Sequence, residues 1–336
     1  MTGDVEARKV ALFLGAGFSK AGHLPLTNEL LDGQLWIVSR RQQQRVIEVL
    51  GSWDAWRAEY GDDVGQFLHA AYRGNVETSA PGTLPGAPLP WPWVAQYLAA
   101  RLSEHTGGAR GGNSPRYFEG LANPSRLGVH QSLFRGLSET GCTLVGVVTS
   151  NYDLLAERVL RPRAVRGWPT GGFHYAGLPQ PQVAVGTARP WRERDGSRPK
   201  TIELTGDVPL AKLHGSLNWE RHGSAHDACS TVTIWQDLRA SFRLDATPAI
   251  VAPVPEDLPE PWLQPIWDAA ASLLRSADEW VVIGYSLPVY DQAIRSLLSA
   301  AAHGQSIVVR DPRADSLLAA YRELLPDSTV VAGAAL

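Results

Sequence analysis

The sequence is poor in cysteine, has no basic cluster and contains no long apolar run, and each absence excludes a class of protein. Its 336 residues include two cysteines, Cys142 and Cys229, which are too few for a zinc site with four cysteine ligands and which fit a reducing compartment. No segment approaches the ~20 apolar residues that a membrane-spanning helix requires. Residues 1–9 are polar and lack the pattern of a signal peptide. We therefore expect a cytoplasmic protein without a membrane segment.

Charge is almost balanced, with 31 basic and 34 acidic residues and a net charge of −3. Because no run is rich in lysine or arginine, we do not expect this chain to bind nucleic acid directly. Apolar residues make up 44% of the sequence, enough for a large core, and 12 tryptophans argue against disorder. We expect a single domain over residues 1–336, without internal repeats or low-complexity segments.

Apolar runs without alternation recur along the chain, and a glycine or polar turn and then a helical pattern follow most of them. Such runs are typical of parallel strands that are buried on both faces. We expect these strands at residues 10–14, 143–148, 209–213, 280–283 and 306–309. Strands that alternate with helices predict an α/β fold, here a Rossmann-like doubly wound parallel sheet.

Two long segments interrupt the alternation of strands and helices. Residues 31–140 contain apolar residues spaced three or four apart, such as Trp53 and Trp56, and predict a mostly helical insertion. Residues 161–205 are rich in proline, glycine and arginine and predict an irregular insertion. Residues 220–230 are polar and predict a loop.

Small or polar residues directly follow four of the expected strands. These turns are Gly15–Gly17, Thr149–Asp153, His214–Ser216 and Gly284–Ser286, with Asp311 as a possible fifth. A glycine turn before a helix lets a ligand approach the backbone and aims N–H groups at an anion such as a diphosphate. Because the carboxyl ends of parallel strands converge on one crevice, the coincidence of these turns predicts a binding site there.

Four motifs in this order resemble the sirtuin-like NAD-consuming family. They are Gly15-Ala16-Gly17-Phe18-Ser19, Thr149-Ser150-Asn151-Tyr152-Asp153, Lys212-Leu213-His214-Gly215-Ser216 and Gly284-Tyr285-Ser286. The closer likeness is to the bacterial sirtuin-like domains of antiphage defence systems, which hydrolyse NAD. The resemblance spans nearly the whole chain, although the two insertions show no detailed match.

The chain departs from the protein-deacetylase branch of that family in two respects. That branch carries a zinc module of four cysteines and a Phe-Arg pair soon after the first glycine turn. Here the chain has two cysteines in total, and Pro25 is followed by Leu26-Thr27-Asn28-Glu29. The departure disfavours deacetylation of protein lysines and favours NAD hydrolysis without a peptide substrate, with no zinc module and no metal.

The resemblance implies that NAD+ is the substrate, and it implies a set of binding residues. The diphosphate would be cradled by Gly15, Ala16, Gly17 and Ser19. The adenosine side would be lined by Gly284 and Ser286, and Asp311 would accept a hydrogen bond from a ribose hydroxyl. The same resemblance adds Pro25 and Thr149 to the residues that contact NAD+.

Three residues would carry the chemistry that the resemblance implies: Asn151, Asp153 and His214. Asn151 and Asp153 would hold the nicotinamide carboxamide and the ribose, and Asn151 would also orient a water. His214 would be the general base, because an imidazole suits proton transfer near neutral pH. Cleavage of the nicotinamide–ribose bond passes through an oxocarbenium-like state, as glycoside cleavage does. Nicotinamide leaves as a neutral molecule, so neither an acid nor a metal is required.

Structural roles stay open for several of these polar residues. Asp153 also suits the N-cap of the helix that follows it, and both roles can coexist. An N-cap is the favoured role of Asp291, and His214 has a satisfied structural histidine as its alternative. A polar loop is favoured over a metal site for three nearby residues, His222, His226 and Cys229.

The expected function is NAD+ hydrolysis that releases nicotinamide and ADP-ribose and depletes NAD+ during antiphage defence. The resemblance implies control by homo-oligomerisation or by a partner protein, such as a hexameric helicase-like ATPase or an Argonaute-like protein. One alternative is a module that binds NAD or ADP-ribose without turnover, which the joint presence of Asn151, Asp153 and His214 disfavours. The other is a protein deacylase or ADP-ribosyltransferase, which the missing zinc ligands disfavour.

Overall fold

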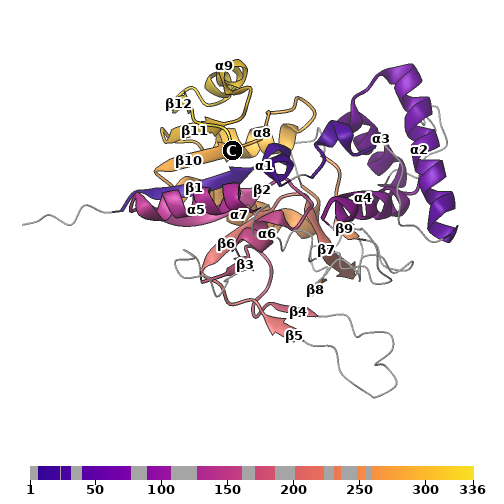
Figure 1. Cartoon of the computed structure of the whole chain (residues 1–336), viewed down its shortest axis with the longest axis horizontal. Helices are drawn as coiled ribbons and strands as arrows, with labels where there is room; N and C mark the ends of the chain where they lie inside the picture. Colours follow the sequence, from indigo (N-terminus) through magenta and orange to yellow (C-terminus); the bar gives the residue numbers. More distant parts are fainter. Residues whose placement is uncertain are drawn as a thin grey trace, which may run out of the picture.

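A seven-stranded parallel sheet forms the centre of the protein (Figure 1). The computed structural model describes residues 7–22, 24–31, 40–76, 89–106, 127–160, 171–185, 201–222, 231–235, 248–253 and 259–336. In spatial order the strands are β12 (Thr329–Ala332), β11 (Ser306–Arg310), β10 (Glu279–Ile283), β1 (Lys9–Leu14), β2 (Thr143–Thr149), β6 (Val208–Lys212) and β3 (Phe173–Tyr175). Every neighbouring pair is parallel, which confirms the predicted doubly wound α/β sheet.

The centre of the sheet lies at β1, whose residues from Val10 to Leu14 are completely buried. This burial on both faces explains why β1 shows no alternation of apolar and polar residues. Leu14 pairs with Thr149 of β2 on one side and with Ile283 of β10 on the other. The chain runs outward from β1 to β2 and outward from β10 to β11 in opposite directions. The order of the strands therefore reverses between β1 and β10, where doubly wound folds bind ligands.

Helices cover both faces of this sheet, as Figure 1 shows. They are α1 (Ala16–Ala21), α5 (Gly128–Glu139), α6 (Leu155–Leu160), α7 (Gln264–Ser276), α8 (Gln292–Ala301) and α9 (Ala314–Leu324). Helix α5 contacts β2 from one face, whereas α7 packs on β1, β2 and β6 from the other and also contacts α8. Right-handed crossovers that run in both directions from the centre produce this two-sided covering.

A group of helices from the predicted insertion stands beside the sheet, at the right of Figure 1. It consists of α2 (Arg40–Tyr60), α3 (Val64–Val76) and α4 (Trp91–Thr106), and α3 also contacts the 3-10 helix η1 (Thr27–Glu29). Aromatic rings join the helices: the ring centroids of Trp53 and Phe67 lie 5.3 Å apart, and those of Tyr72 and Trp91 lie 4.9 Å apart. The indole N–H of Trp91 donates to the carbonyl of Ile250, which ties α4 to the rest of the protein.

A second sheet of five strands lies next to the first. The sequence indicates short strands at residues 231–234 and 248–252, but it does not predict that they join a second sheet. Its order is β5 (Thr201–Glu203), β4 (Val183–Val185), β8 (Thr231–Trp235), β7 (Gly215–His222) and β9 (Pro248–Ile250). Residues 220–222, read from the sequence as the start of a loop, belong to β7. The segment 161–205, expected to be irregular, supplies β3, β4 and β5, and β3 joins the main sheet. These strands have three residues each, too few for a recognisable period.

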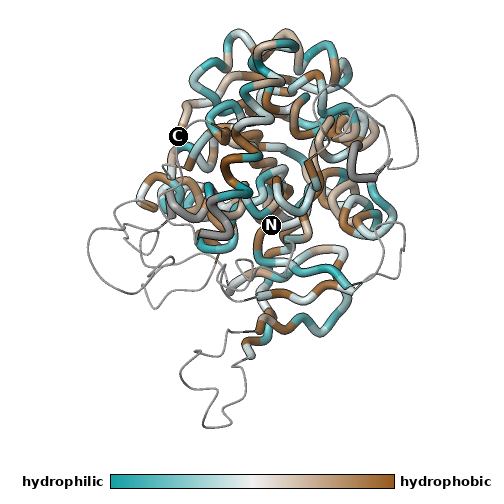
Figure 2. Tube along the Cα trace, turned by 90° about the vertical axis from the view of Figure 1, so that its right-hand side faces the viewer, coloured by the Kyte–Doolittle hydropathy of each residue, from teal (hydrophilic) through white to brown (hydrophobic). Residues whose placement is uncertain are grey.

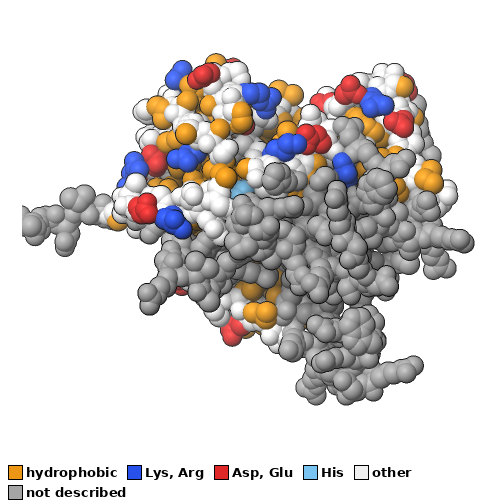
Figure 3. Space-filling view, viewed as in Figure 1, with side chains coloured by type: hydrophobic (Ala, Val, Ile, Leu, Met, Phe, Trp, Pro, Cys, Tyr) orange, Lys and Arg blue, Asp and Glu red, His pale blue; other side chains and the backbone are white. Residues whose placement is uncertain are grey.

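Hydropathy and charge are distributed as in a folded protein with a large apolar core. The apolar segments run through the interior of the trace, and the hydrophilic residues concentrate on the outer helices (Figure 2). On the face shown in Figure 3, the basic and acidic side chains of the described residues are interspersed. None of the helices in the described ranges combines the length and the apolar character needed to cross a bilayer.

Candidate functional site

A cavity opens at the carboxyl ends of β1 and β10, where the strand order reverses. Its empty volume is about 740 Å³, with the open solvent at its mouth included. The structure brings together eight of the predicted site residues in the lining of this cavity: Ala16, Ser19, Pro25, Asn151, Asp153, His214, Gly284 and Ser286.

The glycines of the first turn have a different role from the one expected. The N–H of Gly15 donates to the carbonyl of Ile283, and the N–H of Gly17 donates to that of Gly284, both at 2.9 Å. These two donors are therefore not free to bind an anion. A Cβ atom on Gly15 would lie 2.5 Å from the carbonyl oxygen of Gly284, and a Cβ on Gly17 would lie 2.6 Å from the Cα of Gly284. Both glycines permit close packing between two turns.

Thr149 and Asp311 lie at strand ends but outside the cavity lining. The hydroxyl of Thr149 donates to the carbonyl of Leu14 at 3.0 Å and accepts from the N–H of Asn151 at 3.1 Å, so it joins β1 to β2. Asp311 accepts from the N–H of Arg313 at 2.8 Å, directly before α9. In this structure both side chains support the backbone near the site.

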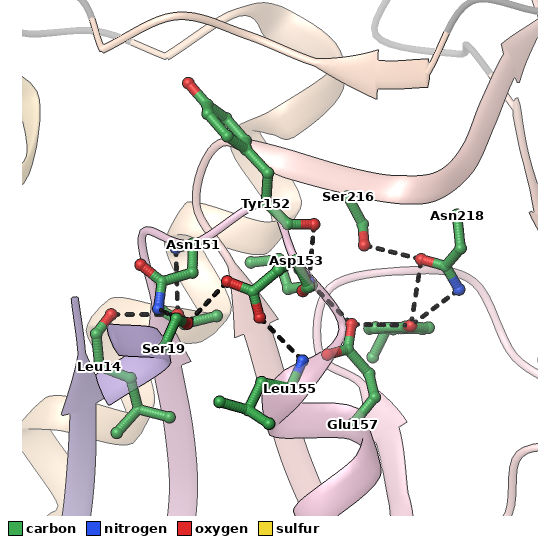
Figure 4. A network of polar contacts seen from close by, with 12 residues as sticks. Leu14, Ser19, Asn151, Tyr152, Asp153, Leu155, Glu157, Ser216 and Asn218 are labelled. Carbon is green, nitrogen blue, oxygen red and sulfur yellow. Dashed lines mark hydrogen bonds and ion pairs between the residues drawn. The ribbon is translucent and has the colours of Figure 1, made fainter. Parts of the chain in front are cut away.

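Asn151, Ser19 and Asp153 form a hydrogen-bonded chain along one wall of the cavity (Figure 4). The Nδ2 of Asn151 donates to the carbonyl of Gly15 at 2.8 Å and to the Oγ of Ser19 at 2.9 Å. The Ser19 hydroxyl donates to the Oδ2 of Asp153 at 2.7 Å. Because Nδ2 must face these two acceptors, the amide orientation of Asn151 is defined. Figure 4 shows its Oδ1 pointing away from this chain.

The carboxylate of Asp153 takes the structural role that the sequence left open. Its Oδ1 accepts from the N–H of Leu155 at 2.8 Å, at the start of α6. Its Oδ2 is occupied by Ser19, and the side chain is 6% exposed. Asp153 therefore caps a helix and orients Ser19 while it lines the cavity.

A buried lysine supports the turn that carries Asn151 and Asp153. Lys212 is completely buried, and its Nζ donates to the carbonyls of Tyr152 and Asp153 and lies 2.8 Å from the Oε1 of Glu157. The hydroxyl of Tyr175 also donates to Glu157. The sequence motif contains Lys212, yet sequence reasoning assigned no role to it and missed Glu157. The available signal was a lysine inside an otherwise apolar strand, because a buried lysine needs a partner.

His214 sits deep in the cavity and faces a carboxylate that sequence reasoning missed. The residue is 2% exposed, and the Nε2 of its imidazole lies 3.6 Å from the Oδ2 of Asp291. Within the described part of the chain, neither ring nitrogen has a hydrogen-bond partner. The imidazole lies beside the rings of Tyr152 and Trp267, with centroid distances of 6.2 Å and 6.4 Å. Among the described residues, therefore, nothing holds the His214 side chain as the hydrogen-bonded structural histidine that was its alternative.

Asp291 occupies the N-cap position of α8, as the sequence predicted, but its side chain makes no capping hydrogen bond. Instead, its Oδ2 accepts from the hydroxyl of Tyr285 at 2.9 Å, and Asp291 and Tyr285 both line the cavity. Burial, and after it the charge of Asp291, raises the pKa of Tyr152 and of Tyr285. Burial raises the pKa of Tyr290 to about 12. These phenols therefore stay protonated at physiological pH, and those of Tyr152 and Tyr285 donate hydrogen bonds.

The helical insertion reaches the wall of this cavity through α3. Gly65 of α3 lies against the ring of Tyr290, because a Cβ atom on Gly65 would lie 2.4 Å from the Cζ of that ring. Leu68 of the same helix and Leu102 of α4 line the cavity. The wall opposite the strand ends is therefore apolar and comes from the insertion.

His130 on α5 is a buried titratable group behind α1. Its Nε2 lies 2.9 Å from the carbonyl oxygen of Phe18, and burial lowers the pKa of its imidazole. The unfolded chain therefore binds a proton at this residue more readily than the folded chain does. Consequently stability is lost as the pH falls through the ordinary imidazole pKa of ~6.5, by up to ~1.4 kcal/mol per pH unit for one proton.

We expect the substitution His130→Gln to reduce this loss of stability at acid pH. The glutamine amide does not titrate, and its N–H can still donate to the carbonyl of Phe18. Urea unfolding of both proteins between about pH 7 and about pH 5 measures the slope of the unfolding free energy. Equal slopes for the wild type and the variant would contradict the prediction.

No metal site forms among the described residues, since no three or more His, Cys, Asp or Glu side chains cluster there. The Nε2 of His222 lies 2.9 Å from the Oγ1 of Thr233 on the neighbouring strand. His226 and Cys229, the other two members of the sequence cluster, lie outside the described residues. The expectation of a site without metal stays a prediction.

Comparison with known proteins adds little to this geometry. No family model matches the sequence, and no curated protein matches it. Among solved structures, the chain is similar to one described as Sir2 in complex with the inhibitor EX-527, 2'-O-acetyl-ADP-ribose and a deacetylated p53 peptide. The identity is 16%, the alignment covers 93% of this chain and 86% of the other, and the TM-score is 0.35.

Proposed function

We propose that the protein is an NAD+ hydrolase that cleaves the bond between nicotinamide and ribose and releases ADP-ribose. One observation carries the proposal. The cavity at the carboxyl ends of β1 and β10 is lined by the carboxamide of Asn151 and by the imidazole of His214, and neither ring nitrogen of that imidazole has a hydrogen-bond partner among the described residues. Doubly wound folds bind dinucleotides at this position. The ordered motifs that resemble sirtuin-like NAD-consuming domains support the same reading.

We assign the roles of these residues from the hydrogen bonds that their side chains make in the described structure. The Oδ1 of Asn151 would accept a hydrogen bond from the nicotinamide carboxamide, because its Nδ2 is already held by Gly15 and Ser19. His214 would take a proton from a ribose hydroxyl or from water. Gly284 and Ser286, on the other side of the reversal point, would contact the adenosine half.

The remaining wall of the cavity would exclude water from the reacting bond. It is built from aromatic and aliphatic side chains: Leu30, Leu68, Leu102, Tyr152, Tyr285 and Tyr290. In such surroundings, a fixed dipole stabilises a developing positive charge on ribose more strongly than it would in water. Because nicotinamide leaves as a neutral molecule, the site needs no acid at the leaving group.

The biological setting that we propose rests on the sequence resemblance alone. It is a cytoplasmic antiphage-defence effector that depletes NAD+ when it is activated. Control would come from homo-oligomerisation or from a partner such as a helicase-like ATPase or an Argonaute-like protein.

The direct test is nicotinamide release from NAD+ by the full chain and by the variants Asn151→Ala and His214→Ala. We expect turnover by the wild type and at least about 100-fold less by each variant, the size of effect typical of a lost general base. The control variant His222→Ala removes an exposed histidine on β7 and should retain full activity. NAD+ binding without nicotinamide release, both in purified protein and in infected or partner-expressing cells, would instead favour the binding module.

A further inference from the structure

The carboxylate of Asp291 is poorly satisfied for a buried charge. The residue is 2% exposed, its Oδ2 accepts one hydrogen bond, from Tyr285, and its Oδ1 has no partner among the described residues. An ionised carboxylate that leaves water normally requires several hydrogen bonds or a cation. A capping bond to α8 would supply one, yet the side chain makes none. The side chain turns instead toward His214.

Other donors around this carboxylate are already committed. The hydroxyl of Tyr152 donates to the carbonyl of Val251 at 2.8 Å, so it does not serve Asp291. Arg295, one turn into α8, donates to the carbonyl of Leu287 at 3.2 Å. The Nε2 of His214, in contrast, has no hydrogen-bond partner among the described residues and lies 3.6 Å from the Oδ2 of Asp291, at ion-pair distance.

We propose that Asp291 is the positioning residue of His214, and that it holds the neutral imidazole in the tautomer that carries its proton on Nε2. In this arrangement the Nε2–H donates to Asp291, and Nδ1 is left as the acceptor. The inference deepens the proposed function, because the role of His214 as a base rests on that function.

Elementary imidazole chemistry supports this assignment. A neutral imidazole has one donor nitrogen and one acceptor nitrogen, and the partner of one nitrogen decides which of them carries the proton. A carboxylate can only accept, so a carboxylate next to Nε2 selects the proton on Nε2. The distance of 3.6 Å is longer than a hydrogen bond, and catalytic contacts often shorten to bonding distance only when substrate binds. Tyr285 holds Oδ2 on the side of the imidazole and thereby fixes the direction of the carboxylate.

Nitrogen NMR of the full chain, with ¹⁵N-labelled histidine and at alkaline pH where the ring is neutral, reads the tautomer directly. The variant His214→Gln assigns the signal. We expect the Nε2–H tautomer of His214 in the wild type and a mixture of both tautomers in Asp291→Asn, because an amide can donate as well as accept. The matched variant Asp315→Asn, which changes an exposed carboxylate in the first turn of α9, should leave the His214 signal unchanged.

Steady-state kinetics with NAD+ add a second measurement. A positioning role predicts that Asp291→Asn lowers kcat by about 100-fold and changes KM by less than about 3-fold, because the lost interaction acts on the transition state. Asp315→Asn should match the wild type in both constants.

The outcomes separate this inference from the proposed function. An Nδ1–H tautomer in the wild type would overturn the role of Asp291, and this test needs no Asp291 variant to fold. An unchanged tautomer in a folded Asp291→Asn protein would overturn it as well. The expected tautomers in a wild-type protein that fails to cleave NAD+ would support the role of Asp291 and count against NAD+ hydrolysis.

Discussion

Replacement of Lys212 by methionine is expected to lower the free energy of unfolding by about 3–5 kcal/mol, the cost of removing one partner from a buried ion pair. Lys212 is 0% exposed and Glu157 is 2% exposed, so water cannot replace the lost ammonium group. The carbonyls of Tyr152 and Asp153 lose a donor in the same step. Urea unfolding of the wild type and the variant measures the difference.

Two further variants show whether the loss arises from the unpaired charge. Adding Glu157→Gln to Lys212→Met should recover part of the stability, because the buried negative charge is then gone. The exposed pair of Lys20 and Glu29, at 2.7 Å, provides the matched control. Lys20→Met should lower the free energy of unfolding by less than about 1 kcal/mol, as is usual for surface ion pairs. A Lys212→Met protein that is as stable as Lys20→Met would contradict the prediction.

Replacement of Gly284 by alanine is expected to lower the free energy of unfolding by about 3 kcal/mol and to weaken ligand binding at the cavity. Gly284 has φ of +63°, and a Cβ atom there would lie 2.3 Å from the Cα of Gly17 and 2.5 Å from its carbonyl carbon. This loss of stability combines about 1 kcal/mol for the left-handed backbone with about 2 kcal/mol for overpacking. Because the atoms that clash are backbone atoms, no side-chain rotation relieves the contact, and the turns after β1 and β10 must separate.

Gly304 offers a control that isolates the strain of the left-handed backbone from the effect of overpacking. Its φ is +96°, but the nearest atom to an added Cβ is the carbonyl oxygen of Asp327, at 3.6 Å. Gly304→Ala should therefore lower the free energy of unfolding by about 1 kcal/mol, which is the strain of the left-handed conformation alone. Chemical denaturation compares the two variants. Equal losses of unfolding free energy in the two variants would show that the contact between the turns after β1 and β10 contributes nothing to stability.

The central sheet could be predicted from the sequence because its strands are buried on both faces. Runs such as residues 10–14 and 280–283 carry enough consecutive apolar residues to be recognised alone. Strand β7 could not be recognised in this way, because Gly215–His222 mixes polar and apolar residues and depends on pairing with 231–235 and 248–250. The pairing with residues 248–250 joins remote parts of the chain, and it leaves no local pattern in the sequence of β7.

The candidate site was predictable in its position more than in its details. Strand ends converge by geometry, so the meeting of Asn151, His214 and Gly284 in one cavity followed from the turns. The role of the glycine N–H groups was not predictable, because their acceptors are carbonyls at the end of β10. Asp291 was missed for another reason: an aspartate directly before a helix has the same sequence signature whether it caps the helix or faces a cavity.

His214 lies where the two sheets meet, since β6 ends at Lys212 and β7 begins at Gly215. One short corner of backbone therefore belongs to both sheets, and it carries the imidazole. Its carbonyl accepts from the N–H of Val251, directly after β9, so the corner is anchored on both sides. A shift of β7 relative to β6 would therefore move the backbone that carries the imidazole.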